Sequence, residues 1–183
     1  MQFIHEVVGA LSKTSCTHII DFFEENINLS RQGGAGNTPL DDLEIALSFD
    51  APEHDDVTFD LKEAIEKSIG EYKTKFPLIN TNLTRWSVYP TCQLMRYEPK
   101  KYYGITHCEN DGTYLTRAFA WMIYLNDIKE GGGTHFVHQN FTTQPKCGNF
   151  YIWPAGWTHS HRGVTNHTSD KYIITGWYDF YDQ

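Results

Sequence analysis

The stretch AFAWMIYLND, residues 118–127, is short, aromatic and apolar, and it ends in a turn-forming Asn–Asp pair. Four further aromatic and β-branched stretches occupy the second half of the chain: RWSVYPTCQLMRYEP (85–99), THFVHQNFTTQP (134–145), GNFYIWP (148–154) and KYIITGWYDFY (171–181). Turn residues separate them, which is typical of consecutive β-strands. Regular short strands of this kind predict a sandwich or barrel.

The first half of the chain differs, because its apolar residues recur near helical spacing. Residues 14–28 predict one helix, with Thr14 or Ser15 as its N-cap. Between the two predicted helices, RQGGAGNTPLDD (31–42) combines Gly, Asn and Pro and predicts a loop, and it lacks the GK[ST] of a phosphate-binding loop. Residues 57–75 predict an amphipathic helix with four apolar residues on its buried side: Phe59, Leu61, Ile65 and Ile69.

Together these patterns predict a mainly β fold with flanking N-terminal helices, of the α+β class. The length of 183 residues fits one domain better than two. We therefore expect a single domain over residues 1–183. Within it, residues 1–79 would form a helical support region and residues 80–183 the strand-rich core.

Charge and composition restrict the partners. The chain has 15 Lys+Arg against 23 Asp+Glu and a net charge of -8, so it lacks the basic surface that duplex DNA or acidic lipid requires. We expect no nucleic acid and no membrane as partners. No apolar run approaches the roughly 18 residues of a membrane span, and the start of the chain resembles no signal peptide. The four cysteines lack CxxC spacing, which argues against a disulfide framework or structural zinc and favours a reducing cytoplasm.

The stretch YYGITHCENDG (102–112) contains a pair of residues suited to binding a metal. His107 and Glu109 are two positions apart, so on a strand both leave the same face, with about 6.5–7 Å between their backbone positions. A nitrogen ligand from a distant strand would complete the two-histidine, one-carboxylate site of non-haem Fe(II) oxygenases, which keeps positions open. The pair alone is a weak signal, because an exposed polar strand face explains it equally well. Asp111 would share that face in a longer strand, but Asn–Asp–Gly is typical of a turn.

Three histidines in WTHSHRGVTNHTSDKYIITGW (157–177) are candidates for the third ligand. If the chain is extended there, His159 and His161 share one face, so geometry leaves both open. His167 lies in a turn-like segment and is expected to be exposed. Two other histidines stand at i and i+3 in a strand-like stretch and are expected to be surface or core residues: His135 and His138.

From about Arg85 to Tyr178 the chain resembles a prolyl 4-hydroxylase of the 2-oxoglutarate/Fe(II) dioxygenase superfamily. The matching pieces occur in the family's order: MRYEP (95–99), HCE (107–109), RAFAWMIYLND (117–127), EGGGTHF (130–136), PKCGNFYIWP (145–154), HRG (161–163) and KYIITGW (171–177). Several phrases look closest to the small hydroxylases of marine bacteriophages. The resemblance implies a double-stranded β-helix, or jelly roll, with iron at one mouth, in an enzyme that acts in the cytoplasm of an infected bacterium.

The resemblance also implies the metal ligands and the main cosubstrate residue. The family's distal histidine precedes its 2-oxoglutarate-binding basic residue by about ten positions. This spacing favours His161, which lies ten before Lys171, over His159. Fe(II) would then be held by His161 together with His107 and Glu109. Lys171 would bind the distal carboxylate of 2-oxoglutarate, for which its compact point charge is suited.

Five further residues match family positions around the same pocket. Tyr97, Tyr124 and Thr134 would border or bind the cosubstrate. Arg117 would reach the substrate channel, and Trp177 would lie at the pocket edge. From the sequence, core packing explains the aromatic residues nearly as well, and a surface ion pair explains the arginine.

One position departs from the family, which normally has Asp where Glu109 stands. A glutamate is still a hard oxygen donor suited to Fe(II). Its extra methylene requires the carboxylate to fold back, or the strand to lie slightly farther from the iron. The replacement of aspartate by glutamate would therefore weaken iron binding.

The implied reaction uses Fe(II), 2-oxoglutarate and dioxygen, with ascorbate as a reductant, to hydroxylate C4 of proline in a peptide or protein. Succinate and carbon dioxide are the coproducts. Three alternatives stay open at this point. The first is a sister oxygenase acting on another side chain, a free amino acid or a small metabolite. The others are a non-catalytic jelly-roll binding module and a cupin-like metalloenzyme that needs no 2-oxoglutarate.

Overall fold

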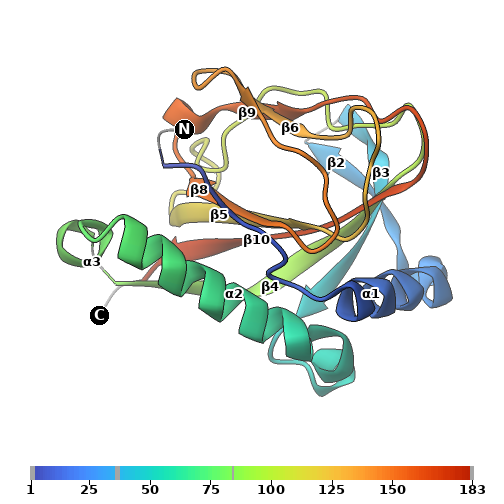
Figure 1. Ribbon diagram of the computed structural model, residues 1–183, viewed down its shortest axis with the longest axis horizontal. Helices are drawn as coiled ribbons and strands as arrows, with labels where there is room; N and C mark the ends of the chain where they lie inside the picture. Colours follow the sequence, from blue (N-terminus) through green and yellow to red (C-terminus); the bar gives the residue numbers. More distant parts are fainter. Residues whose placement is uncertain (1–2, 36–37, 84, 182–183) are drawn as a thin grey trace.

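The computed structural model describes residues 3–35, 38–83 and 85–181, and Figure 1 shows two sheets facing each other with the long helices on one side. Within these residues, the large sheet has seven strands in the order β1-β8-β5-β10-β4-β3-β2. The small sheet has three, in the order β7-β6-β9. The strand pairs are antiparallel. The expected α+β class is confirmed.

The helices come early in the chain and most strands come late, but three strands of the large sheet, β1, β2 and β3, lie within residues 1–79, where only helical support was expected. The long helices are α1 (Lys13–Glu25) and α2 (Asp55–Lys75), followed by the short α3 (Ile79–Asn82). The large sheet contains β1 (His5–Val7), β2 (Arg31–Ala35), β3 (Thr38–Ser48), β4 (Trp86–Tyr97), β5 (Arg117–Tyr124), β8 (Phe150–Pro154) and β10 (Lys171–Phe180). The small sheet contains β6 (Thr134–Phe136), β7 (Phe141–Thr142) and β9 (His161–Gly163).

The large sheet separates two apolar clusters, because successive side chains of a strand point to opposite faces. On β10, Tyr172, Ile174 and Tyr178 belong to the cluster that α1 and α2 complete. Ile173 and Trp177 belong instead to the cluster on the other face, which β6 also joins. One face of the sheet is therefore a conventional helix-backed core. The other face is free to line a site between the two sheets.

Helix α1 starts earlier than the sequence pattern indicated. Its N-cap is Ser12, whose side chain accepts a hydrogen bond from the Ser15 backbone N–H at 3.0 Å. The expectation of Thr14 or Ser15 as the cap was wrong. A cap must precede the N–H group that it satisfies by about three residues, and Ser12 meets this condition with Ser15 inside the first turn.

Helix α2 confirms the predicted amphipathic helix but corrects one of its buried residues. Leu61, Ile65 and Ile69 are buried, whereas Phe59 is 71% exposed. Two positions on a helix differ by about 200°, so Phe59 and Leu61 cannot share a face. No helix in the described ranges combines the length and the apolar composition needed to cross a bilayer.

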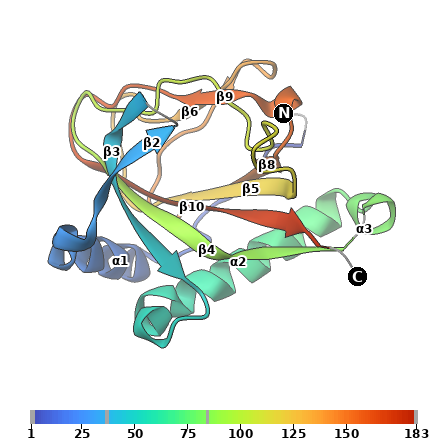
Figure 2. The same cartoon turned by 180° about the vertical axis from the view of Figure 1, so that it is seen from behind.

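The loop expected over residues 31–42 is a strand hairpin instead, apart from residues 36–37, which lie outside the described residues. Figure 2 shows β2 and β3 at the edge of the large sheet beside β4. Pairing of β3 with β4, from Leu43 to Ser48, supplies backbone hydrogen bonds that the local composition does not reveal. Pro39 is compatible with this strand because it pairs only with Gly34 of β2, beyond the end of the β3–β4 ladder.

Candidate metal centre

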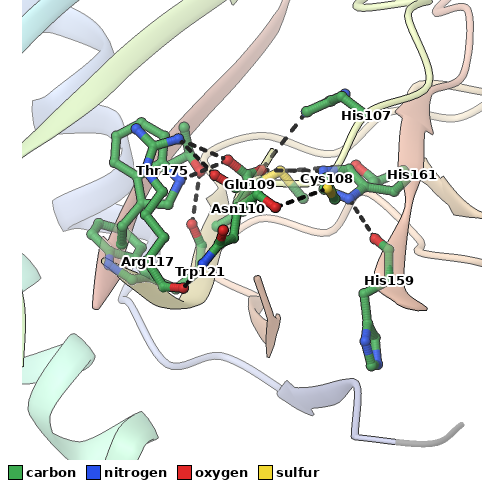
Figure 3. Close-up of polar contacts among 12 residues, drawn as sticks. His107, Cys108, Glu109, Asn110, Arg117, Trp121, His159, His161 and Thr175 are labelled. Carbon is green, nitrogen blue, oxygen red and sulfur yellow. Dashed lines mark hydrogen bonds and ion pairs between the residues drawn. The ribbon is translucent and has the colours of Figure 1, made fainter. Parts of the chain in front are cut away.

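Three side chains from two distant parts of the chain meet between the two sheets. The ligand atoms of His107, Glu109 and His161 lie within 4.8 Å of one another. The loop carrying His107 is held against β9 by two backbone hydrogen bonds, from His107 N to His161 O at 3.0 Å and from His161 N to His107 O at 2.8 Å. This pairing brings together two histidines that are 54 positions apart. Figure 3 shows the three side chains converging.

Both imidazoles present the same nitrogen to the carboxylate. His107 Nδ1 lies 2.9 Å from the Ile105 carbonyl oxygen, and His161 Nδ1 lies 2.9 Å from the His159 carbonyl oxygen. A carbonyl only accepts, so each Nδ1 carries the hydrogen. Each Nε2 faces Glu109 Oε1, at 3.7 Å from His107 and 3.3 Å from His161. Backbone carbonyls therefore orient both rings toward one point, as in protein metal sites.

The other candidate ligands lie apart from this cluster. His159 is buried, but Figure 3 shows its ring turned away from the other two, and its Nδ1 lies 3.0 Å from Thr158 Oγ1. The backbone carbonyl of His159, and not its side chain, contributes to the cluster, because it orients the ring of His161. Asp111 is exposed and accepts from the Thr113 N–H at 2.9 Å, in the expected turn. His167 is also exposed, as expected.

The remaining two histidines also lie outside the cluster. His135 Nδ1 lies 3.0 Å from Thr142 Oγ1, and His138 is exposed with its ring edge-on to Trp157. Over the residues that the structure describes, the cluster of His107, Glu109 and His161 is the one group of three suited to a metal ion.

Lys171 is a buried cation in the cavity beside the cluster. The cavity has a volume of about 710 Å³, and its lining includes Lys171 and all three cluster residues. Lys171 is 4% exposed, its Nζ donates to the Gly132 carbonyl oxygen at 3.2 Å, and it lies 4.3 Å from the centre of the Tyr97 ring. Burial lowers the pKa of Lys171 to about 8, against the opposing effect of Asp42. The ammonium is thus mostly protonated at pH 7 and positioned for an anionic group.

Of the three residues expected around the cosubstrate, two line the cavity and one lies behind its wall. Tyr97 and Thr134 line the cavity. Tyr124 is fully buried and does not line it, and its hydroxyl lies 2.6 Å from Thr143 Oγ1 and 3.4 Å from Thr134 Oγ1. Any influence of Tyr124 on a bound molecule would therefore pass through Thr134.

Arg117 and Trp177 line the cavity and contact the carboxylate of the cluster. Trp177 Nε1 donates to Glu109 Oε2 at 2.7 Å, and Arg117 Nη1 lies 3.3 Å from the same oxygen. Both residues were expected near the substrate, whereas their contacts with Glu109 were not expected from the sequence. The spacing of Trp177 partly indicated its position, because Trp177 and Lys171 are six residues apart on β10 and so lie on the same face of the strand.

Residues 92–179 match the family model of the 2OG-Fe(II) oxygenase superfamily. The matched range contains all three cluster residues and Lys171. In this range, which is just under half of its length, the chain is similar to members of the 2OG-Fe(II) oxygenase superfamily. Among curated proteins, no sequence matches the chain.

Several solved structures with a similar fold are prolyl hydroxylases. The viral collagen prolyl hydroxylase vCPH from Paramecium bursaria Chlorella virus-1, in its 2OG complex, has a TM-score of 0.71 and 16% identity, covering 98% of this chain and 97% of that chain. The prolyl hydroxylase from Trichoplax adhaerens, in complex with a hypoxia inducible factor peptide fragment, has a TM-score of 0.76 and 15% identity, with 98% and 84% covered. A Pseudomonas putida prolyl-4-hydroxylase has a TM-score of 0.69 and 14% identity, with 98% and 93% covered.

These likenesses establish the fold, and they confirm the expected jelly roll. At such identities they do not transfer a substrate. None of the three structures comes from a bacteriophage, so the resemblance to phage hydroxylases stays a prediction.

The cluster fits the Fe(II) of the oxygenase superfamily by its donors and by its charge. Two imidazole nitrogens and one carboxylate oxygen are the donor set of non-haem Fe(II) oxygenases. Burial raises the pKa of Glu109, but hydrogen bonds from His107 and His161 outweigh it and hold that pKa well below its usual value. Burial lowers the pKa of His107, and the bond to Glu109 outweighs it and raises that pKa. The free protein thus holds an ionised carboxylate beside two imidazoles, an arrangement suited to a bound cation.

Proposed function

We propose that this chain is a 2-oxoglutarate- and Fe(II)-dependent dioxygenase that hydroxylates a peptide or protein side chain, with C4 of peptidyl proline as the target. One observation carries the proposal: the cluster of His107, Glu109 and His161 opens into the same cavity as the buried ammonium of Lys171. A metal-binding triad alone fits many enzymes. A triad with a buried cation beside it fits a cosubstrate that chelates the metal at one end and carries a second carboxylate at the other.

Each residue of the site has a distinct task in this proposal. His107, Glu109 and His161 hold Fe(II). Lys171 binds the distal carboxylate of 2-oxoglutarate, with Thr134 beside it in the cavity wall. When bound, Fe(II), 2-oxoglutarate and dioxygen supply an oxidative decarboxylation in which one oxygen atom enters succinate and the other enters the substrate as a hydroxyl group. The protein orients the reacting carbon and excludes water.

Two features support a peptide as the substrate. The cavity extends from the triad to residues of the β2–β3 hairpin and to Tyr89 and Tyr114, which are 42% and 51% exposed. Exposed aromatic side chains at a cavity mouth suit contact with an extended chain. The similar Trichoplax adhaerens structure is a complex with a peptide fragment.

Coupled turnover tests the proposal. The chain is incubated with Fe(II), 2-oxoglutarate and ascorbate, with and without proline-rich peptides, and succinate and peptide mass are measured. Peptide-dependent succinate, together with one added oxygen on proline, supports prolyl hydroxylation. Succinate that rises with a free amino acid or a metabolite, and not with peptides, supports a sister oxygenase. Absence of succinate under every condition contradicts an oxygenase and favours a binding module.

A further inference from the structure

The two oxygens of the Glu109 carboxylate have different neighbours. Oε1 faces the metal-binding nitrogens, at 3.3 Å from His161 Nε2 and 3.7 Å from His107 Nε2. Oε2 faces two donors, Trp177 Nε1 at 2.7 Å and Arg117 Nη1 at 3.3 Å. An indole N–H and a guanidinium donate and never accept. Oε2 is therefore occupied on the side away from the imidazoles.

The two donors are held rigidly. The Arg117 guanidinium lies between two aromatic rings, 3.7 Å from the centre of Tyr114 and 3.8 Å from the centre of Trp177. Its side chain is 14% exposed. Trp177 lies on β10, in the middle of the large sheet. Stacking of this kind restricts a guanidinium to one plane, so both donors are positioned before any metal binds.

A glutamate at this position needs such support more than an aspartate does. The backbone of Glu109 is fixed by a hydrogen bond from its N–H to the Ala155 carbonyl oxygen at 3.0 Å. The extra methylene adds one rotatable bond between this fixed backbone and the carboxylate. Without outside contacts, the carboxylate has the freedom to turn both oxygens toward the metal.

We infer that Trp177 and Arg117 form a carboxylate clamp, which holds Oε2 of Glu109 and leaves Oε1 alone to bind the metal. This inference rests on the proposed metal site. A carboxylate binds a cation through one oxygen or through both. If Glu109 binds through one oxygen only, the triad would leave positions on the ion open for 2-oxoglutarate and dioxygen. The clamp thus makes a glutamate a workable replacement for the aspartate that the resemblance leads one to expect.

Replacing Trp177 by Phe tests the clamp. Trp177→Phe keeps a ring against Arg117 and removes the N–H, and Arg117→Met keeps a long side chain and removes the donors. Trp157→Phe is the matched control, since this indole is 70% exposed and lies outside the cavity lining. Mn²⁺ affinity is measured by titration without 2-oxoglutarate. We expect both clamp variants to bind Mn²⁺ roughly 10-fold more weakly and the control to be unchanged.

The number of water molecules on the bound Mn²⁺ separates positioning from a general loss of structure. If Glu109 turns to bind through both oxygens, one water is displaced, and the water-proton relaxation enhancement per bound Mn²⁺ falls by about a third. If the substitution only loosens the site, Mn²⁺ affinity falls but the relaxation enhancement per bound Mn²⁺ stays the same. Thermal melts of each variant exclude unfolding as the cause.

Shortening the carboxylate completes the test. In a Glu109→Asp background, the carboxylate is drawn back from Trp177, so Trp177→Phe is expected to change Mn²⁺ affinity much less than in the native background. Unchanged affinity and unchanged relaxation in both clamp variants overturn the clamp and leave the oxygenase proposal intact. Equal effects of Trp177→Phe in the two backgrounds also overturn it. A native chain that binds no Mn²⁺ contradicts the metal site and the clamp together.

Discussion

At the residue scale, the direction of a ring decides which histidine joins the metal site. His159 and His161 are both buried and are only two positions apart. The ring of His161 faces Glu109, whereas the ring of His159 turns away and its carbonyl oxygen orients His161 instead. The segment is not a simple strand, since a 3-10 turn covers Trp157–His159 before β9 begins at His161.

This difference predicts opposite results for two substitutions. His161→Ala removes a ligand nitrogen and is expected to abolish measurable Mn²⁺ binding. His159→Gln keeps the backbone carbonyl that orients the His161 ring, and is therefore expected to keep Mn²⁺ affinity within about threefold. Isothermal titration measures both. Loss of binding in His159→Gln, with His161→Ala unaffected, contradicts the assignment of His161.

Lys171 predicts how 2-oxoglutarate binding depends on pH. Its pKa is lowered from 10.5 to about 8 by burial, so the free protein loses this positive charge as the pH rises through 8. The affinity for 2-oxoglutarate is therefore expected to be full near pH 7 and to fall above pH 8. The Kd for 2-oxoglutarate in the presence of Mn²⁺, measured from pH 6.5 to 9.5, reports this change. A flat profile contradicts the role of the ammonium.

Removal of the same charge is the companion experiment. Lys171→Met keeps a side chain of similar length and is expected to weaken 2-oxoglutarate binding by roughly 10–100-fold, the strength of a hydrogen bond to a charged group. Mn²⁺ affinity is expected to stay as it is. Lys146→Ala, at an exposed position, is the control and changes neither. Loss of Mn²⁺ binding in Lys171→Met indicates a structural effect.

At the scale of elements, β10 connects the site to the core. Lys171, Ile173 and Thr175 line the cavity, whereas Tyr172 and Ile174 pack toward α1 and α2. The two helices therefore pack against the face of β10 opposite the one that carries Lys171 and Trp177: Tyr172 contacts α1 through Phe23, and Tyr178 contacts α2 at Ile65.

The corrected face of α2 predicts a contrast in stability. Leu61 is fully buried, and Leu61→Ala is expected to lower the free energy of unfolding by about 2–5 kcal/mol. Phe59 is 71% exposed, and Phe59→Ala is expected to change it by less than about 0.5 kcal/mol. Urea unfolding followed by circular dichroism measures both. A larger effect at Phe59 contradicts the assigned face.

At the scale of the whole molecule, the two sheets enclose a site lined by the β2–β3 hairpin, by β4, β5, β6, β8, β9 and β10, and by the loop that carries His107 and Glu109. The apolar clusters on the two faces of the large sheet do not include the metal-binding side chains. The fold is therefore expected to persist without a metal, while the ligands bind to an existing framework.

Thermal unfolding checks this expectation. Removal of divalent cations by a chelator is expected to leave the far-ultraviolet circular dichroism unchanged. A ligand at 100 times its Kd adds about 2.7 kcal/mol of stability, so Mn²⁺ and then 2-oxoglutarate are expected to raise the melting temperature in two steps. Lys171→Met is expected to retain the first step and lose the second. Collapse of the spectrum on chelation indicates instead that the metal is needed for folding.

Local patterns in the sequence determined the helices, most of the strands and the candidate metal-binding pair of His107 and Glu109. Helical periodicity and strand alternation depend on neighbouring residues. The strand expected over His107 and Glu109 is instead a loop with one isolated bridge, from His107 to His161, so the convergence of the two side chains also depends on that distant pairing. Family spacing, rather than local geometry, then favoured His161 over His159.

The tertiary structure decided the features that depend on contacts between distant segments. Residues 31–42, apart from the undescribed 36–37, form a hairpin because β4 offers β3 a row of hydrogen-bond partners, which Gly and Pro content does not reveal. Likewise, the partners of Glu109 Oε2 come from β5 and β10, 8 and 68 positions away. Composition and spacing encode which groups are present, whereas the directions of their atoms follow from how the two sheets close on each other.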